Sequence, residues 1–316
     1  MKRKYCVPKM LGCMLFAFVV MAAGFYVGAP YNVNAVAVKI TDNAVPLSSG
    51  IKLPATGSKK YSGGSATIDV SNASDGYIMA KFTGSKAARI RLTRSGKTTY
   101  TYRLRSDGAW ETFPLSSGSG RYNIEVLRNV SGNSYSWELT QSIEVKLDDP
   151  YGPFLYPNQF VNFNAKSKAV EKGAELAKGG TNQLEIISKV YNFVIGTVQY
   201  DNAKAKKVSA GDLAGYVPDL DQVLKTNKGI CFDYAALMAG MLRSQGIPTR
   251  MEFGYVSGGV YHAWLSVFLE ERGWVNNVIQ FDGKSWSLMD PTFASSQGAN
   301  SQYVGKGSNY QVKFLY

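Results

Sequence analysis

Cysteine and histidine are scarce in this chain of 316 residues, which has three cysteines and one histidine. Cys6 and Cys13 lie near the N-terminus, whereas Cys231 opens a helical pattern far downstream. His262 lies near the start of a later strand pattern, and Asp290 ends another. A thiol, an imidazole and a carboxylate can act as a nucleophile, its base and the group that orients the base. Cys231, His262 and Asp290 are therefore the candidate catalytic residues.

The sequence around Cys231 predicts a helix that begins at this residue. Gly246 and Pro248 end the pattern, as expected for a helix C-terminus. The free N–H groups and positive potential of a helix N-terminus favour thiolate over thiol, and they can also hold an oxyanion. The alternative is that Cys231 is a small buried hydrophobic residue, as lone cysteines commonly are. The face expected to be buried consists of Leu237, Met238, Met241 and Leu242.

Strand patterns follow this helix and carry the other two residues. Residues 250–256 and 261–269 are expected to form strands, with His262 on the same face as Trp264. An Asp-Gly pair at 282–283 is a hairpin signal, and the strand after it delivers Asp290. A single histidine is usually structural, but its combination with one cysteine and a strand-terminal aspartate favours catalysis.

Three segments resemble the signature segments of the transglutaminase-like superfamily, which are papain-like thiol enzymes. They are Gly229-Ile230-Cys231, His262-Ala263-Trp264 and Asp290-Pro291-Thr292-Phe293. The resemblance extends over about residues 150–293 and implies helices packed on an antiparallel sheet. It also implies Cys231 as nucleophile, His262 as base and Asp290 as orienting group.

Two aromatic residues are further candidates for lining the site. Tyr200 resembles the aromatic position that helps to line the oxyanion site in this superfamily, although a packed aromatic residue is an equal alternative. Trp264, on the His262 face, is the second candidate. Compact members have a short hairpin where this chain has residues 270–283, so the strand order there stays open.

The region before residue 150 has a different pattern. Short alternating or β-branched segments, separated by Gly- and Ser-rich turns, predict an all-β sandwich. Its aromatic residues Tyr100, Tyr102 and Trp110 could line a carbohydrate or peptide surface, but core or cross-strand positions are more common for such residues. The expected strands are 66–70, 76–82, 88–93, 98–104, 110–114, 122–128 and 135–145.

The predicted fold class is therefore α+β, a β-sandwich followed by a papain-like, transglutaminase-like domain. The expected division is a signal peptide at 1–37, a linker at 38–60, the sandwich at 61–148 and the catalytic domain at 149–316. The turn-rich segment from Asp148 to Pro153 marks the boundary between the last two.

The N-terminus has the pattern of an export signal, with a basic lead, an apolar run and Ala35-Val36-Ala37 as a cleavage site. An uncleaved membrane anchor is the alternative, because the apolar run approaches transmembrane length. We expect a secreted or cell-envelope protein cleaved near Ala37. Cleavage removes Cys6 and Cys13 and leaves Cys231 unpaired, which favours a chemical role for its thiol.

The net charge is +12, and the basic residues are scattered along the chain. This excess favours weak attraction to anionic cell-wall polymer, lipid or nucleic acid, but basic residues that are scattered rather than clustered mostly form a solvated surface. Nucleic-acid binding is not expected, because no recognisable motif accompanies the charge. Neither a metal site nor a cofactor is expected, since Cys231 is the sole thiol after cleavage and His262 the sole imidazole, too few for a zinc site.

The leading hypothesis is thioester acyl transfer outside the cytoplasm, from a glutamine side chain or a peptide amide of a protein or peptide substrate. A cysteine peptidase or amidase of the same fold is one alternative. A non-catalytic envelope protein that binds through its β-sandwich is another. The motifs do not choose between an amine and water as acceptor, because that choice depends on how the pocket excludes water, and they leave the oligomeric state open.

Overall fold

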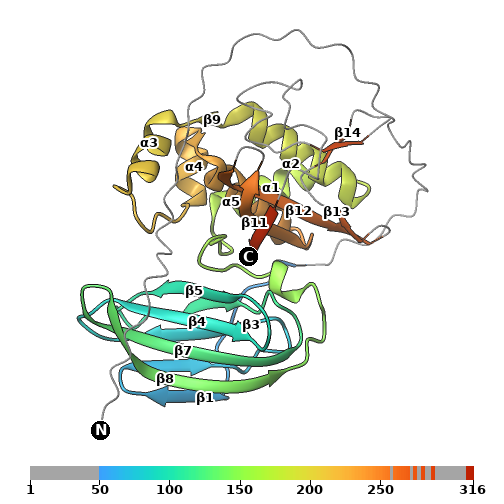
Figure 1. Ribbon diagram of the computed structural model, residues 1–316. Coiled ribbons are helices and arrows are strands. Elements are labelled where there is room, and N and C mark those ends of the chain that lie inside the picture. Colours follow the sequence, from blue (N-terminus) through green and yellow to red (C-terminus); the bar gives the residue numbers. More distant parts are fainter. Residues whose placement is uncertain (1–49, 257–258, 271–272, 276–278, 282–285, 289–310) are drawn as a thin grey trace.

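A β-sandwich forms the first part of the computed structural model, which describes residues 50–256, 259–270, 273–275, 279–281, 286–288 and 311–316 (Figure 1). Its two antiparallel four-stranded sheets have the strand orders β1-β2-β3-β6 and β5-β4-β7-β8. The strands are β1 Lys60–Gly63, β2 Ala66–Asp69, β3 Tyr77–Phe82, β4 Ala88–Arg94, β5 Thr99–Leu104, β6 Glu111–Pro114, β7 Gly120–Ser131 and β8 Ser134–Val145.

Side-chain alternation explains why these segments form a sandwich. In β5 every second residue is buried, namely Tyr100, Tyr102 and Leu104, and the residues between them are exposed. Successive side chains of a strand point to opposite faces, so this pattern gives the strand one apolar face and one solvated face.

Helices dominate the chain after the sandwich. A short 3₁₀ turn, Gly152–Phe154, precedes them, and aspartate or asparagine caps three of them: the side chains of Asn182, Asp201 and Asp219 each accept a backbone hydrogen bond. The helices are α1 Lys168–Ala177, α2 Gln183–Thr197, α3 Asn202–Ala210, α4 Leu220–Thr226 and α5 Cys231–Ser244.

An antiparallel sheet with the order β13-β12-β11-β16 packs against α5. The last strand, β16, returns from the end of the chain to pair with β11. The strands outside the sandwich are β9 Gln199–Tyr200, β10 Lys228–Gly229, β11 Thr249–Val256, β12 Val260–Leu269, β13 Gly273–Val275, β14 Ile279–Phe281, β15 Trp286–Leu288 and β16 Gln311–Leu315. Helices on an antiparallel sheet, after a β-sandwich, confirm the predicted fold class.

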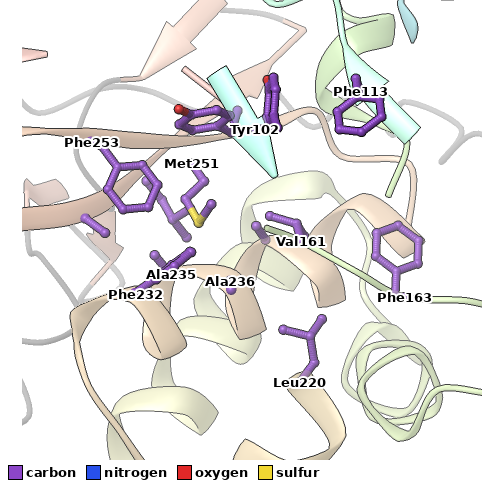
Figure 2. Close-up of a cluster of buried hydrophobic side chains, with 14 of the residues drawn as sticks. Tyr102, Phe113, Val161, Phe163, Leu220, Phe232, Ala235, Ala236, Met251 and Phe253 are labelled. Carbon is purple, nitrogen blue, oxygen red and sulfur yellow. The ribbon is translucent and has the colours of Figure 1, made fainter. Parts of the chain in front are cut away.

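Helix α5 lies at the centre of this second part. It packs against α1, α2 and α4 and also against β11 and β12. Figure 2 shows Phe232, Ala235 and Ala236 of α5 beside Met251 and Phe253 of β11. The expectation of one buried face was too narrow, because every residue of α5 is buried.

Arg243 is a buried cation near the end of α5. Its guanidinium donates to the carbonyl oxygens of Thr249 at 2.9 and 2.7 Å, Tyr156 at 3.0 Å and Tyr316 at 2.6 Å. Burial lowers the pKa of Arg243 to about 9, so the side chain stays cationic at neutral pH. One side chain thus joins α5 to β11, to the segment after the sandwich and to the residue after β16.

Aromatic residues connect the sandwich to the second part. The ring of Tyr102 on β5 lies 5.6 Å from that of Phe160 and 5.7 Å from that of Tyr316. Phe160 in turn contacts Phe232 of α5, at 5.7 Å between ring centroids.

The expected signal peptide and its cleavage site lie outside the described residues. Within the described part of the chain, no helix combines the length and the apolar character needed to cross a membrane.

Candidate active site

Cys231 is the first residue of α5 and is 2% exposed. The preceding residue, Ile230, has an extended backbone and stands at the N-cap position. The side chain of Asp233 accepts a hydrogen bond from the Ile230 N–H at 2.8 Å, which fixes the start of the helix. Cys231 therefore lies at the free backbone N–H groups and the positive dipole potential of a helix N-terminus.

Gly229, two residues before Cys231, allows a close approach in this turn. A Cβ atom at Gly229 would lie 2.6 Å from the Cβ atom of Asp233, which is too short for any side chain. Gly229 also pairs in parallel with Tyr200, and its carbonyl oxygen accepts from the Asp201 N–H at 2.8 Å. The structure thus places half-buried Tyr200 on the strand next to the turn that leads into Cys231. Its role in lining an oxyanion site stays a prediction.

His262 lies near the start of β12 and is 3% exposed. Its ring is nearly parallel to that of Trp264, with 16° between the planes and 6.4 Å between the centroids. This arrangement confirms that the two side chains share a face. Opposite His262 on β11 is Gly254, where a Cβ atom would lie 1.9 Å from the carbonyl oxygen of Gln311 on β16.

Trp264 is fully buried and is held by a carboxylate. Its indole N–H donates to Oε2 of Glu252 at 2.9 Å, across the β11–β12 pair. Burial raises the pKa of Glu252, and hydrogen bonds from Ser266 and Trp264 and the charge of Arg250 oppose that shift. Trp264 therefore packs beside His262 and is fixed by its hydrogen bond to Glu252.

Tyr261 connects β12 to the candidate nucleophile. Burial raises the pKa of Tyr261, and the electrostatic influence of Tyr255 and of Cys231 adds to the shift. Strand β12 packs against α5: the ring of Tyr261 lies 6.1 Å from that of Phe253, which lies 4.9 Å from that of Phe232, the residue after Cys231. Because neighbouring residues of a strand point to opposite faces, Tyr261 and His262 have opposite orientations. The structure brings together the elements that carry Cys231 and His262, and direct pairing of thiol and imidazole stays a prediction.

The third candidate, Asp290, lies outside the described residues, as does the Asp-Gly turn at 282–283. The two strands flanking that turn, β14 and β15, pair with each other as a hairpin would. Sequence reasoning did not identify Tyr261 or Asp233 as part of this site. The acidic residue three positions after the N-cap Ile230 was the available signal for Asp233.

Metal ligands do not gather at this site in the part of the chain that the structure describes. Among those residues, no three or more of His, Cys, Asp and Glu are placed to hold a metal ion. Cys231 is free and buried.

Comparison with known proteins finds relatives of the second part of the chain. Residues 171–277 match the profile of the transglutaminase-like superfamily. Human kyphoscoliosis peptidase is 27% identical over 204 residues, which cover 61% of this chain and 26% of the peptidase. A protein-glutamine gamma-glutamyltransferase of Pseudomonas aeruginosa is 36% identical over 69 residues, which cover 18% of this chain and 10% of that enzyme.

Among solved structures, red sea bream transglutaminase aligns at 12% identity over 70% of this chain and 49% of that chain, with a TM-score of 0.28. The aligned region is about a quarter of the length of the human peptidase and a tenth of that of the Pseudomonas enzyme. The matched region is therefore too small a part of these relatives to assign their whole-protein activities to this chain.

Proposed function

Because the chain carries a domain of the transglutaminase-like superfamily at residues 171–277, we propose that it is a thiol acyl-transfer enzyme with Cys231 as the nucleophile. The observation that carries the proposal is the place of Cys231 at the buried N-terminus of α5. A helix N-terminus favours the thiolate and offers N–H donors to an oxyanion.

In the proposed reaction, Sγ of Cys231 attacks the carbonyl carbon of an amide, either a glutamine side chain or a peptide bond. His262 takes the thiol proton and returns it to the departing nitrogen as the C–N bond breaks, which releases ammonia or an amine. A thioester remains on Cys231. This step requires the His262 imidazole to reach the thiol from the start of β12, with Asp290 on its other nitrogen.

The second half-reaction resolves the thioester with a lysine amine or with water. An amine gives an isopeptide cross-link, and water gives a carboxylic acid. The relatives support both outcomes, because one is named a glutamyltransferase and another a peptidase. We propose a protein or peptide substrate met outside the cytoplasm, where the positive charge of the chain would favour association with the anionic cell wall.

The test uses the chain from residue 38 onwards, incubated with casein and a fluorescent primary amine. The wild type should attach the amine to casein glutamines or, as a hydrolase, cleave the casein chain or deamidate those glutamines. Mass spectrometry of the product distinguishes these outcomes. Cys231→Ala should abolish all of them, and unchanged turnover by that variant would contradict the proposal.

A further inference from the structure

A buried ion pair, Lys204–Asp233, lies at the start of α5, the helix that begins with the proposed nucleophile. Asp233, two residues after Cys231, is fully buried. Its Oδ2 atom accepts from the Lys204 ammonium at 3.0 Å and from the Ile230 N–H at 2.8 Å, and its Oδ1 atom accepts from the Tyr216 hydroxyl. Lys204 also donates to the Tyr216 hydroxyl at 3.0 Å, which closes a triangle of three side chains.

The triangle joins three separate parts of the fold. Lys204 comes from α3, Tyr216 from the segment between α3 and α4, and Asp233 from α5. Asp201, which caps α3, accepts from the Lys204 N–H at 2.8 Å and donates its own N–H to Gly229. The turn that supplies Lys204 is therefore bonded to the strand that leads into Cys231.

Electrostatics give this arrangement a consequence for the thiol. A buried carboxylate two residues from Cys231 would disfavour a thiolate there and oppose the positive potential of the helix start. The Lys204 ammonium, with a side chain only 22% exposed, cancels that charge at 3.0 Å. Burial and the charge of Asp233 raise the pKa of Tyr216, so this neighbour stays a neutral donor.

We propose that Lys204 is a positioning residue for Cys231. Lys204 neutralises Asp233 and ties the strand that carries Tyr200 to the start of α5. With the charge of Asp233 neutralised, the positive potential of the helix start can stabilise the thiolate of Cys231. This inference rests on the proposed function, in which Cys231 reacts as a thiolate.

Several other ionisable groups lie around the site, and the variants below leave all of them unchanged. Tyr261 and His262 come from β12, and Glu252 comes from β11, where it is bonded to Trp264. Lys228 on β10 is exposed, and Asp219 and Asp201 act electrostatically on Tyr216.

The test measures the thiolate fraction of Cys231 against pH, by absorbance at 240 nm with the Cys231→Ala spectrum subtracted. Lys204→Met leaves Asp233 uncompensated and should raise the pKa of Cys231 by about one unit. Asp233→Asn leaves Lys204 unpaired and should lower it by a similar amount. The double variant removes both charges and should titrate near the wild type.

Opposite signs separate a charge effect from damage to the fold, because damage would shift both single variants in the same direction. Lys204→Arg keeps the charge and should titrate as the wild type. Tyr216→Phe keeps both charges and should shift the titration less than Lys204→Met. If Lys204→Met does not fold, Asp233→Asn and the double variant carry the comparison.

Shifts of equal sign, or no shift in a folded variant, would overturn the role of Lys204. If Cys231→Ala is inactive while these shifts are missing, only this inference fails. If Cys231→Ala stays active, the proposed function fails instead.

Discussion

Among single residues, Glu252 carries a buried carboxyl group beside the candidate base. It is 3% exposed and accepts from the indole of Trp264, the neighbour of His262. Burial raises its pKa above the unfolded value of 4.5. A raised folded pKa means that the group contributes stability below that unfolded value, and the contribution is lost as pH rises through the folded pKa.

Replacing Glu252 with glutamine tests this linkage. The amide keeps an acceptor for Trp264 without a charge, so the variant should be more stable than the wild type at pH 7.5, by about 1 kcal/mol. The difference should shrink as pH falls towards 4.5. Urea unfolding at both pH values measures it, and a difference independent of pH would contradict the account.

Among the secondary-structure elements, α5 is held by close packing on all sides. Gly173 of α1 faces α5 so closely that a Cβ atom there would lie 3.0 Å from the carbonyl oxygen of Met241 and 3.2 Å from its Cα atom. Either the backbone of the helix that carries Cys231 or that of α1 would have to move.

Two glycine substitutions separate packing from helix propensity. Gly173→Ala should destabilise the protein by about 1–2 kcal/mol, because the clash involves backbone atoms. Gly196→Ala in α2 is the matched control: a Cβ atom there meets nothing within 4 Å. It should stabilise by about 0.5–1 kcal/mol, as alanine does in helices. If denaturant unfolding shows that both variants gain equally in free energy of unfolding, the close contact at Gly173 is refuted.

Strong periodicity made some elements predictable. The expected strand 98–104 is β5 within one residue at its start, because polar and buried residues alternate there. Helix α3 was missed, since only Ala205 and Val208 are buried and no apolar stripe marks it. Strand β1 was missed for a similar reason, since no side chain in it is fully buried. The complete burial of α5 depends on neighbours from both sides, which periodicity along one segment does not report.

Across the whole molecule, the sandwich and the second part share an aromatic interface. The Leu315 N–H donates to the hydroxyl of Tyr100 at 3.4 Å, and the rings of Tyr102 and Tyr316 lie 5.7 Å apart. From the sequence, Tyr100 and Tyr102 could be either core residues or residues that line a binding surface. In the structure both are buried and make packing contacts. Their partner Tyr316 lies at the far end of the chain, so no local pattern could predict the contact.

Tyr102 tests how strongly the interface holds the molecule together. Among the described residues its hydroxyl is buried without a hydrogen-bond partner. Tyr102→Phe should therefore be neutral or stabilising by up to about 1 kcal/mol, whereas Tyr102→Ala should cost about 3–5 kcal/mol through the cavity it leaves. Calorimetry of the wild type should show one cooperative transition, and separate transitions for the two parts would contradict a shared core.

The central proposal is that Cys231 is an activated thiol paired with His262, and the alkylation rate of Cys231 tests it most directly without a known substrate. Iodoacetamide labelling of Cys231 at pH 6, followed by peptide mass spectrometry, should be fast in the wild type and at least about tenfold slower in His262→Ala. A wild-type rate typical of an unactivated thiol, unchanged by His262→Ala, would contradict the account.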